Sequence, residues 1–275
     1  MKNLHFRYAM KISFDSPVSK HRFTVKCIPQ TNERQSIDNL VVSVFPNQSL
    51  GQDRDSFGNR CIFGHCEMEH QRFEIVVEGD AKTGLSSCET GGAPHMLGLY
   101  RYQSFYTIPG GKIKEYFANI SFSEAMSDYE KGVFMMHRLY EDFRYVQGVT
   151  NIQTTAEEAM ELGCGVCQDY SHILISLCHL AGIPARYVVG MLTGEGASHA
   201  WVEVYQDEKW YALDPTNNLI VDDQHIKISH GRDYRDCLIN QGVFTGCAKQ
   251  TQEIQVVVEE MNYGQDSGIC GTSRG

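Results

Sequence analysis

Apolar and polar residues alternate with a period of two along much of the first 95 residues. The clearest stretches cover residues 6–14, 23–28, 40–45 and 73–77, and turn-forming Pro, Gly, Asn and Asp residues separate them. This alternation is typical of strands with one face buried and the other in water. The pattern therefore predicts a β-rich domain over residues 1–95.

A helical period replaces the alternation after residue 120. A helix is expected to begin near residue 123, because the run Ser-Phe-Ser-Glu at 121–124 has the spacing of a capping box. The run Thr-Thr-Ala-Glu at 154–157 predicts the start of a second, short helix in the same way. One face of the first helix is marked by Val133, Met136, Tyr140 and Phe143.

A third helix is predicted after a glycine-rich turn. Gly182 and Pro184 are typical of residues just past its C-terminus. Cys167 therefore lies in the first turn, where backbone N–H groups have no partner within the helix. The core-facing stripe of this helix consists of Tyr170, Ile173, Leu174, Leu177, Leu180 and Ala181.

A β-hairpin is predicted over residues 199–214, with a polar turn in its middle. If Tyr205 faces Trp210 across the turn, His199 and Asp214 lie on one face in diagonal positions, about 7–8 Å apart. Long side chains bridge that distance. A turn one residue longer or shorter places the two side chains on opposite faces.

These elements divide the chain into four segments and predict an α+β fold class. Residues 1–95 form the antiparallel β domain, and 96–120 form a connecting segment with Gly and Pro. Residues 121–262 form the mixed core. The last segment, 263–275, is rich in Gly and Ser and is expected to be a flexible tail.

Charge and composition argue against several classes of protein. The chain of 275 residues has a formal net charge of −10, whereas nucleic-acid binding requires basic patches. No apolar run approaches the roughly 18 residues of a membrane span, and the first eight residues lack the apolar segment of a secretory signal. Ten cysteines in such a chain predict reduced thiols. We therefore expect a cytoplasmic protein that binds neither nucleic acid nor membranes.

Cys167, His199 and Asp214 suit the three members of an acyl-transfer triad. A free thiol has a pKa near ~8.5, and a helix N-terminus or a neighbouring imidazolium lowers such a pKa to roughly 3.5–7.5. The predicted helix supplies the first effect and His199 the second, while Asp214 can orient the imidazole. The backbone N–H of Cys167 can also stabilise the oxyanion of a tetrahedral intermediate.

Several short motifs resemble the bacterial branch of the transglutaminase-like superfamily. In the core they are Gly-Val-Cys-Gln-Asp at 165–169, Gly-Ile-Pro-Ala-Arg-Tyr-Val at 182–188, Ser-His-Ala-Trp-Val-Glu-Val at 198–204, Leu-Asp-Pro-Thr-Asn at 213–217 and Gly-Arg-Asp-Tyr at 231–234. This resemblance covers roughly residues 120–260. Asp-Ser-Phe-Gly-Asn at 55–59 is similar to part of the β-rich domain that precedes the core in this branch.

The resemblance implies a papain-like α+β core, in a group whose members are often described as cysteine proteases. It implies that Cys167 is the nucleophile, that His199 is the general base and acid, and that Asp214 orients His199. Cys164 is a departure, because the family pattern does not require a second thiol beside the nucleophile. Cys164 and Cys167 also have the spacing of a redox dithiol, but the strand-then-helix context of a thioredoxin unit is missing.

Two further groups of residues have competing interpretations. Tyr145, Gln168 and Trp201 are candidates for the substrate cleft, although an aromatic residue beside a buried helix is more often part of the core. A soft metal could be bound by Cys61, His65, Cys66 and His70. Their spacing is not that of a zinc finger, and strand alternation scatters them over two faces. We therefore expect no metal and no cofactor.

The pattern as a whole predicts an enzyme that cleaves amide bonds in a peptide or protein substrate through a thioester, as a cysteine peptidase or amidase. Transfer of the acyl group to an amine, as in a protein-glutamine transglutaminase, is the alternative. A non-catalytic interaction module that keeps the fold is a further one. The absence of an EF-hand-like acidic loop from the sequence gives no support for calcium dependence.

Overall fold

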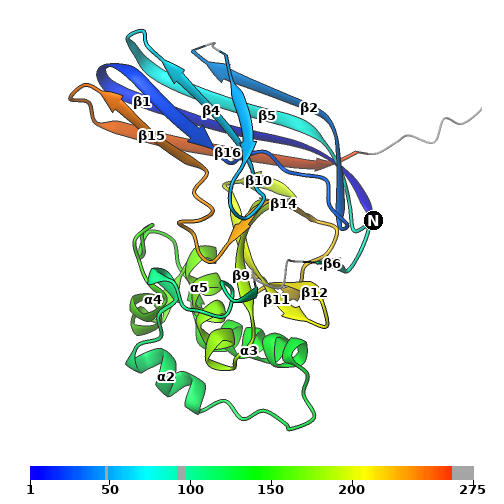
Figure 1. The fold of residues 1–275 in the computed structure, drawn as a ribbon. Helices are drawn as coiled ribbons and strands as arrows, with labels where there is room; N and C mark the ends of the chain where they lie inside the picture. The colour runs from blue at the N-terminus through cyan, green and yellow to red at the C-terminus, as the bar shows by residue number, and fades with distance from the viewer. Residues whose placement is uncertain (47–48, 92–96, 262–275) are drawn as a thin grey trace, which may run out of the picture.

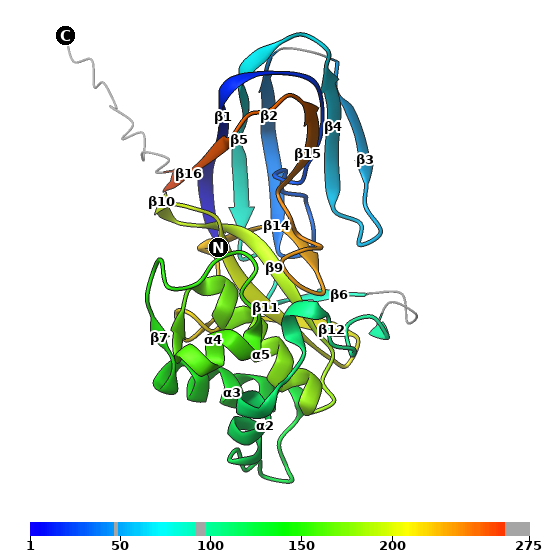
Figure 2. The same ribbon diagram turned by 90° about the vertical axis from the view of Figure 1, so that its left-hand side faces the viewer.

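The computed structural model describes residues 1–46, 49–91 and 97–261, which form two packed parts (Figure 1, Figure 2). One part is a broad antiparallel sheet, and the other is a smaller sheet with helices packed beside it. The tail predicted at 263–275 lies outside the described residues. Within the described ranges, no helix is long and apolar enough to cross a membrane.

The broad sheet is built around one long strand, β1 (Lys2–Val25), whose even-numbered residues from Leu4 to Phe14 are buried. The stretches predicted at 6–14 and 23–28 therefore belong largely to a single strand. Its register with β5 shifts between Ser13 and Val18, where the strand bends. The other strands of the sheet are β2 (Gln35–Phe45), β3 (Gly51–Arg54), β4 (Arg60–Cys66), β5 (His70–Thr83), β10 (Gly194–Gly196), β15 (Asn240–Thr245) and β16 (Gln250–Glu260).

The chain returns to the broad sheet at its C-terminal end. β16 pairs with the first half of β1, and β15 pairs with the second half. Val256 and Val258 lie opposite Tyr8 and Phe6, and all four side chains are buried. The structure thus differs from the predicted core over 121–262, because its last strands complete the N-terminal sheet. A local apolar pattern indicates that a strand has a buried face but does not indicate its pairing partner.

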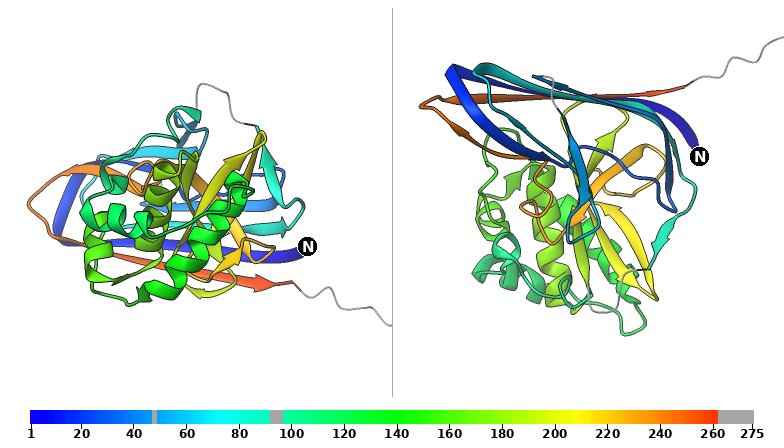
Figure 3. Two further views of the ribbon diagram at one scale, coloured as in Figure 1. Left: turned by 90° about the horizontal axis from the view of Figure 1, so that it is seen from below. Right: turned by 45° about the horizontal axis from the view of Figure 1, so that its top comes forward.

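The smaller sheet has six strands, and the order of five is β13–β12–β11–β9–β14, with β6 beside β12. Its strands are β6 (Cys88–Thr90), β9 (Ala185–Leu192), β11 (His199–Gln206), β12 (Lys209–Asp214), β13 (Leu219–Ile220) and β14 (His225–Gly231). Helices pack beside it (Figure 3). They are the 3₁₀ turn η1 (Phe105–Thr107), α2 (Gly111–Ala118), α3 (Asp128–Asp142), α4 (Ala156–Leu162) and α5 (Cys167–Leu180). A short parallel ribbon joins β7 (Arg144–Tyr145) to β8 (Cys164–Gly165).

The helix α5 is the central element of this part, and its residues from Asp169 to His179 are buried. It begins at Cys167, as the sequence predicts. Gly182 follows the C-cap residue Ala181 with a left-handed φ of 76°, a conformation that glycine adopts without strain.

The other two predicted helices are present with shifted starts. α3 begins at Asp128 rather than near residue 123, because Ser127 and Glu130 form its capping box. α4 is capped by Thr155 and Glu158, one residue later than the predicted pair. Serines and threonines cluster before both helices, so local spacing alone does not select the capping residue.

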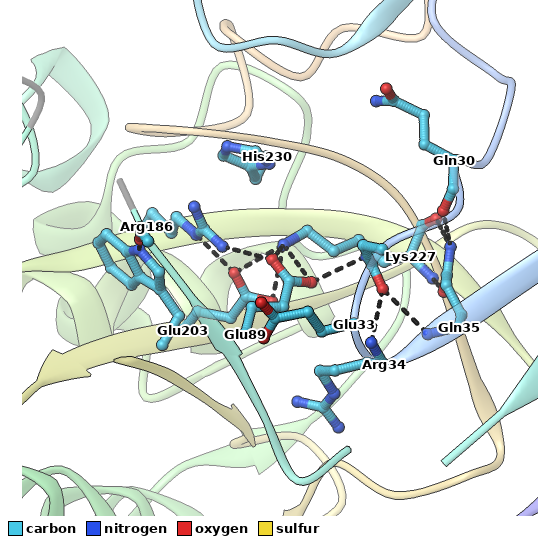
Figure 4. A network of polar contacts seen from close by, with 12 residues as sticks. Gln30, Glu33, Arg34, Gln35, Glu89, Arg186, Glu203, Lys227 and His230 are labelled. Carbon is cyan, nitrogen blue, oxygen red and sulfur yellow. Dashed lines mark hydrogen bonds and ion pairs between the residues drawn. The ribbon is translucent and has the colours of Figure 1, made fainter. Parts of the chain in front are cut away.

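A cluster of buried charges crosses the smaller sheet and reaches β6 (Figure 4). Arg186 on β9 donates through Nε to Glu203 on β11, and its Nη2 lies 2.9 Å from Glu89 on β6. Lys227 on β14 contacts both carboxylates, with Nζ 2.8 Å from Glu203 and 2.9 Å from Glu89. Arg186 also lies over the ring of Trp210 at 4.1 Å.

The same cluster anchors the first residue of β2 and the residue before it. The side-chain amide of Gln35 donates to the carbonyl of Lys227, and its oxygen accepts the N–H of Lys227, both at 2.8 Å. Arg34 donates to the carbonyl of Val221 at 2.6 Å. These buried contacts therefore join the broad sheet to the smaller one.

We predict that Glu203→Ala destabilises the protein by about 3–5 kcal/mol, because it leaves Arg186 and Lys227 buried without a shared carboxylate. Urea unfolding measures the effect, and Glu161→Ala on the exposed side of α4 is the control, with an expected change within about 0.5 kcal/mol. Equal changes in the two variants would contradict this account.

The cluster also makes the stability of the folded protein depend on pH. Burial alone would raise the pKa of Glu203, but Arg186 and Lys227 outweigh it and lower that pKa. The stabilisation by Glu203 is therefore fully present above the ordinary glutamate pKa of about 4.3, and it is lost as the pH falls through the lower, folded-state value.

Candidate active site

Cys167 occupies the first position of α5, and a buried carboxylate shapes the turn before it. Asp169 accepts the N–H of Val166 and the hydroxyl of Thr150, both at 2.7 Å. Gly165 is required beside it, because a Cβ at that position would lie 2.4 Å from the Asp169 carboxylate. The turn therefore presents the Cys167 thiol at the helix N-terminus in one fixed conformation.

The hairpin brings His199 and Asp214 together. Tyr205 pairs with Trp210, so the register predicted from the sequence is confirmed. Nε2 of His199 at the start of β11 lies 2.7 Å from Oδ2 of Asp214 at the end of β12. The two residues that the pattern placed diagonally are in direct contact.

Asp214 is completely buried, and its oxygens are held by the residues that follow it. Oδ1 accepts the backbone N–H groups of Thr216 and Asn217, and Oδ2 accepts the side-chain amide of Asn217 at 2.8 Å. The sequence contains a signal for this arrangement, because aspartate commonly accepts N–H groups two or three residues further along the chain.

The protonation states follow from these contacts. Burial alone would lower the pKa of His199, but hydrogen bonds to Asp214 and to the Cys167 thiol outweigh it and raise that pKa to about 10. Burial alone would raise the pKa of Asp214, but the hydrogen bonds from His199 and His225 lower it. Because Nε2 of His199 faces Asp214, Nδ1 is the nitrogen left for the thiol.

His225 is a second histidine on the same carboxylate, and sequence reasoning missed it. Its Nε2 lies 3.2 Å from Oδ2 of Asp214, and its Nδ1 lies 3.4 Å from Oδ1 of Asp222. The side chain is 1% exposed. No local pattern marks this residue, because β9 separates β14 from the hairpin in the sheet and only the folded chain brings the side chains together.

One group of ligand atoms in the described part of the chain could hold a metal ion. Nitrogens of His199 and His225 and an oxygen of Asp214 lie within 4.8 Å of one another. Asp214 is already an acceptor for five donors, and a metal on His199 Nε2 would replace its bond to the carboxylate. The hydrogen-bonded triad accounts for this geometry, and the expected absence of a metal stays a prediction.

The other candidate metal ligands do not gather. Cys61, His65 and Cys66 alternate along β4, and they belong to no group of three close ligand atoms among the described residues. His70 instead lies 3.1 Å from His21. Cys164 and Cys167 are not joined by a disulfide in this structure.

A cavity of about 530 Å³ opens beside the triad, and both Cys167 and His199 line it. Gln168 lines it too, as predicted for a cleft residue. Tyr145 is half exposed and lies outside the lining. Trp201 is a correction: it is 1% exposed and packs edge-on against His225, so it belongs to the core beneath the triad.

Comparison with known proteins gives two matches along the chain. Residues 116–215 match the family described as the transglutaminase-like superfamily, and residues 4–82 match the bacterial transglutaminase-like N-terminal region. An uncharacterized protein of Mycobacterium leprae is 34% identical over 125 residues, which are 42% of this chain. The chain spans 44% of that relative's length. An uncharacterized protein of Mycobacterium tuberculosis is 26% identical over 239 residues, with 74% of this chain and 76% of the relative covered.

A solved structure has the same fold over nearly the whole chain. It is a protein of Cytophaga hutchinsonii described as a "Putative Cysteine Protease", with a TM-score of 0.75 and 22% identity. The match covers 96% of this chain and 92% of that one, and at this identity it shows the fold alone. Both family matches fall where the sequence motifs place them, one in each part of the molecule. The chain belongs to the transglutaminase-like superfamily, in its bacterial branch, with the N-terminal region of that branch ahead of the core.

Proposed function

We propose that this protein is a cysteine-dependent acyl-transfer enzyme that hydrolyses amide bonds in a peptide or protein substrate. The observation that carries the proposal is His199, which bridges the thiol of Cys167 and the buried carboxylate of Asp214. With its pKa raised to about 10, His199 is an imidazolium at neutral pH and places a positive charge beside the Cys167 sulfur.

The reaction follows from these positions. The Cys167 sulfur attacks the amide carbon, and the helix N-terminus with the Cys167 N–H stabilises the oxyanion. His199 donates its proton to the leaving amine as the C–N bond breaks, and a thioester remains. The neutral imidazole then takes a proton from water, which attacks the thioester and releases the acid. Asp214 keeps the imidazole oriented through both steps.

Transfer to an amine in place of water is the second candidate, because it uses the same thioester. A non-catalytic module is less favoured, since all three triad positions are filled and the thiol lines a cavity. The proposal includes the cytoplasm as the place of action, where glutathione keeps such a thiol reduced.

A panel of peptide and amide substrates, analysed by mass spectrometry of trapped thioesters with and without a primary amine, tests the reaction. We expect an acyl adduct on Cys167 and hydrolysis as the main outcome. Cys167→Ser is expected to lose activity, and Cys164→Ser, the matched control three residues away, to keep most of it. If both variants are equally inactive under reducing conditions, dithiol chemistry replaces this proposal.

Alkylation by iodoacetamide tests the thiolate–imidazolium pair. Cys167 is expected to react rapidly at pH 6, where less than about 1% of an ordinary thiol is ionised. His199→Ala should slow this reaction about tenfold or more and move its pH dependence upward, because the imidazolium is lost. A Cys167 that reacts no faster than the other accessible thiols would instead favour the non-catalytic module.

His225 is expected to act through Asp214 rather than on the substrate. His225→Phe should lower kcat about tenfold, equivalent to one lost hydrogen bond, and leave KM unchanged. Asp214→Ala should lower kcat by about 10²–10⁴-fold while Cys167 stays open to alkylation. Single-turnover kinetics on a substrate from the panel measure both, with His5→Phe on an exposed position of β1 as the control. A raised KM with unchanged kcat in His225→Phe would place this residue in substrate binding.

A further inference from the structure

The active-site cavity has walls from both parts of the molecule. Cys167 and His199 line it from one part, and residues of β1, β15 and β16 line it from the broad sheet. The C-terminal strands therefore lie over the nucleophile although they come at least 70 residues after it. Whatever acyl chain Cys167 receives must pass along this wall.

The wall that β1, β15 and β16 supply contains no residue with a formally charged side chain. None of the residues that line the cavity, all of them in the described part of the chain, is Asp, Glu, Lys or Arg. These four types make up 21% of the sequence, so a random lining of this size would contain several. His21, which lines the far end, is neutral as well, because burial and its neighbour His70 lower its pKa to about 4.

Successive side chains of β16 point to opposite faces of the sheet, and those that line the cavity carry no charge. Gln250 and Gln252 point to the cavity, whereas Glu253 lies on the other face of the strand, in register with Lys11 of β1. The carboxylate of Glu253 thus lies on the face away from the cavity, and the carboxamides of Gln250 and Gln252 line it.

Carboxamides also come from β15, where Asn240 and Gln241 line the cavity. Each carboxamide offers two N–H donors and one acceptor oxygen, which complement the C=O and N–H of a peptide group. The oxygen of Asn240 is buried and has no donor among the described residues. A substrate N–H group that donates to this oxygen would remove the free-energy cost of leaving a buried acceptor unpaired.

We propose that this wall selects an extended, uncharged polypeptide segment, whose backbone amides are bound by the carboxamides of β15 and β16. Charged residues beside the scissile amide are disfavoured, because they would leave water and meet no opposite charge on the wall that β1, β15 and β16 supply. This inference rests on the proposed function and adds its substrate class. The broad sheet is then a specificity element of the enzyme.

Three peptidyl acyloxymethyl ketones test the inference, identical except for Gln, Glu or Lys beside the reactive carbonyl. Intact-mass spectrometry follows their rates of labelling at Cys167 in the full chain. We expect the Gln probe to react about tenfold faster than either charged probe. In Gln250→Glu and Gln252→Glu, the ratio of Lys-probe to Glu-probe rates should rise about fivefold, the scale of a solvent-exposed ion pair.

The matched control is Gln255→Glu, the same chemical change on the opposite, exposed face of β16. It is expected to leave the Lys-to-Glu ratio unchanged. Equal rates for the three probes on the wild-type chain, or an equal shift in Gln255→Glu, would overturn the inference. Iodoacetamide labelling in parallel separates the two proposals. If iodoacetamide still labels Cys167 preferentially, equal probe rates or an equal shift in Gln255→Glu count against the selective wall alone. If iodoacetamide shows no preference for Cys167, the proposed function itself fails.

Discussion

The buried charge of Asp214 is the constraint on which the site depends. A carboxylate that leaves water must be compensated completely, and here two imidazoles, two backbone N–H groups and one side-chain amide do so. These five donors come from three structural requirements: the register of the hairpin, the turn after β12 and the position of β14. The catalytic geometry is therefore a consequence of satisfying one buried group.

The same constraint sets the protonation states of the two groups next to Cys167. Asp214 stays ionised because its pKa is lowered, and His199 stays protonated because its own is raised. Burial disfavours the charged form of each group. Both groups are nevertheless charged, because the hydrogen bonds that they make outweigh the effect of burial. The thiol of Cys167, at the N-terminus of α5, therefore lies beside a positively charged imidazole. Its nucleophilic character needs no metal ligand in this scheme.

The second set of buried charges serves the architecture. Glu203 and Glu89 share Arg186 and Lys227 across three strands of the smaller sheet and β6, and Gln35 ties the start of β2 to Lys227. These contacts fix how the broad sheet sits on the core. Since that sheet forms one wall of the cavity beside Cys167, this network also contributes to the shape of that cavity.

The sequence by itself determined the local features of this protein. The apolar stripe and the glycines placed Cys167 at the start of α5, and the length of the polar turn determined that His199 and Asp214 share a face. These are short-range consequences of the helical and strand periods. Local spacing was less decisive where several caps compete, as before α3. The motifs also identified the family, in both parts of the chain.

Only the tertiary structure decided which distant segments meet. The return of β15 and β16 to β1, the contact of His225 with Asp214 and the burial of Trp201 depend on strand order, which alternation does not encode. The carboxamide wall opposite Cys167 exists for the same reason. A period of two predicts which side chains of a strand face inward. Which other strand or helix those side chains contact depends on the packing of the whole chain.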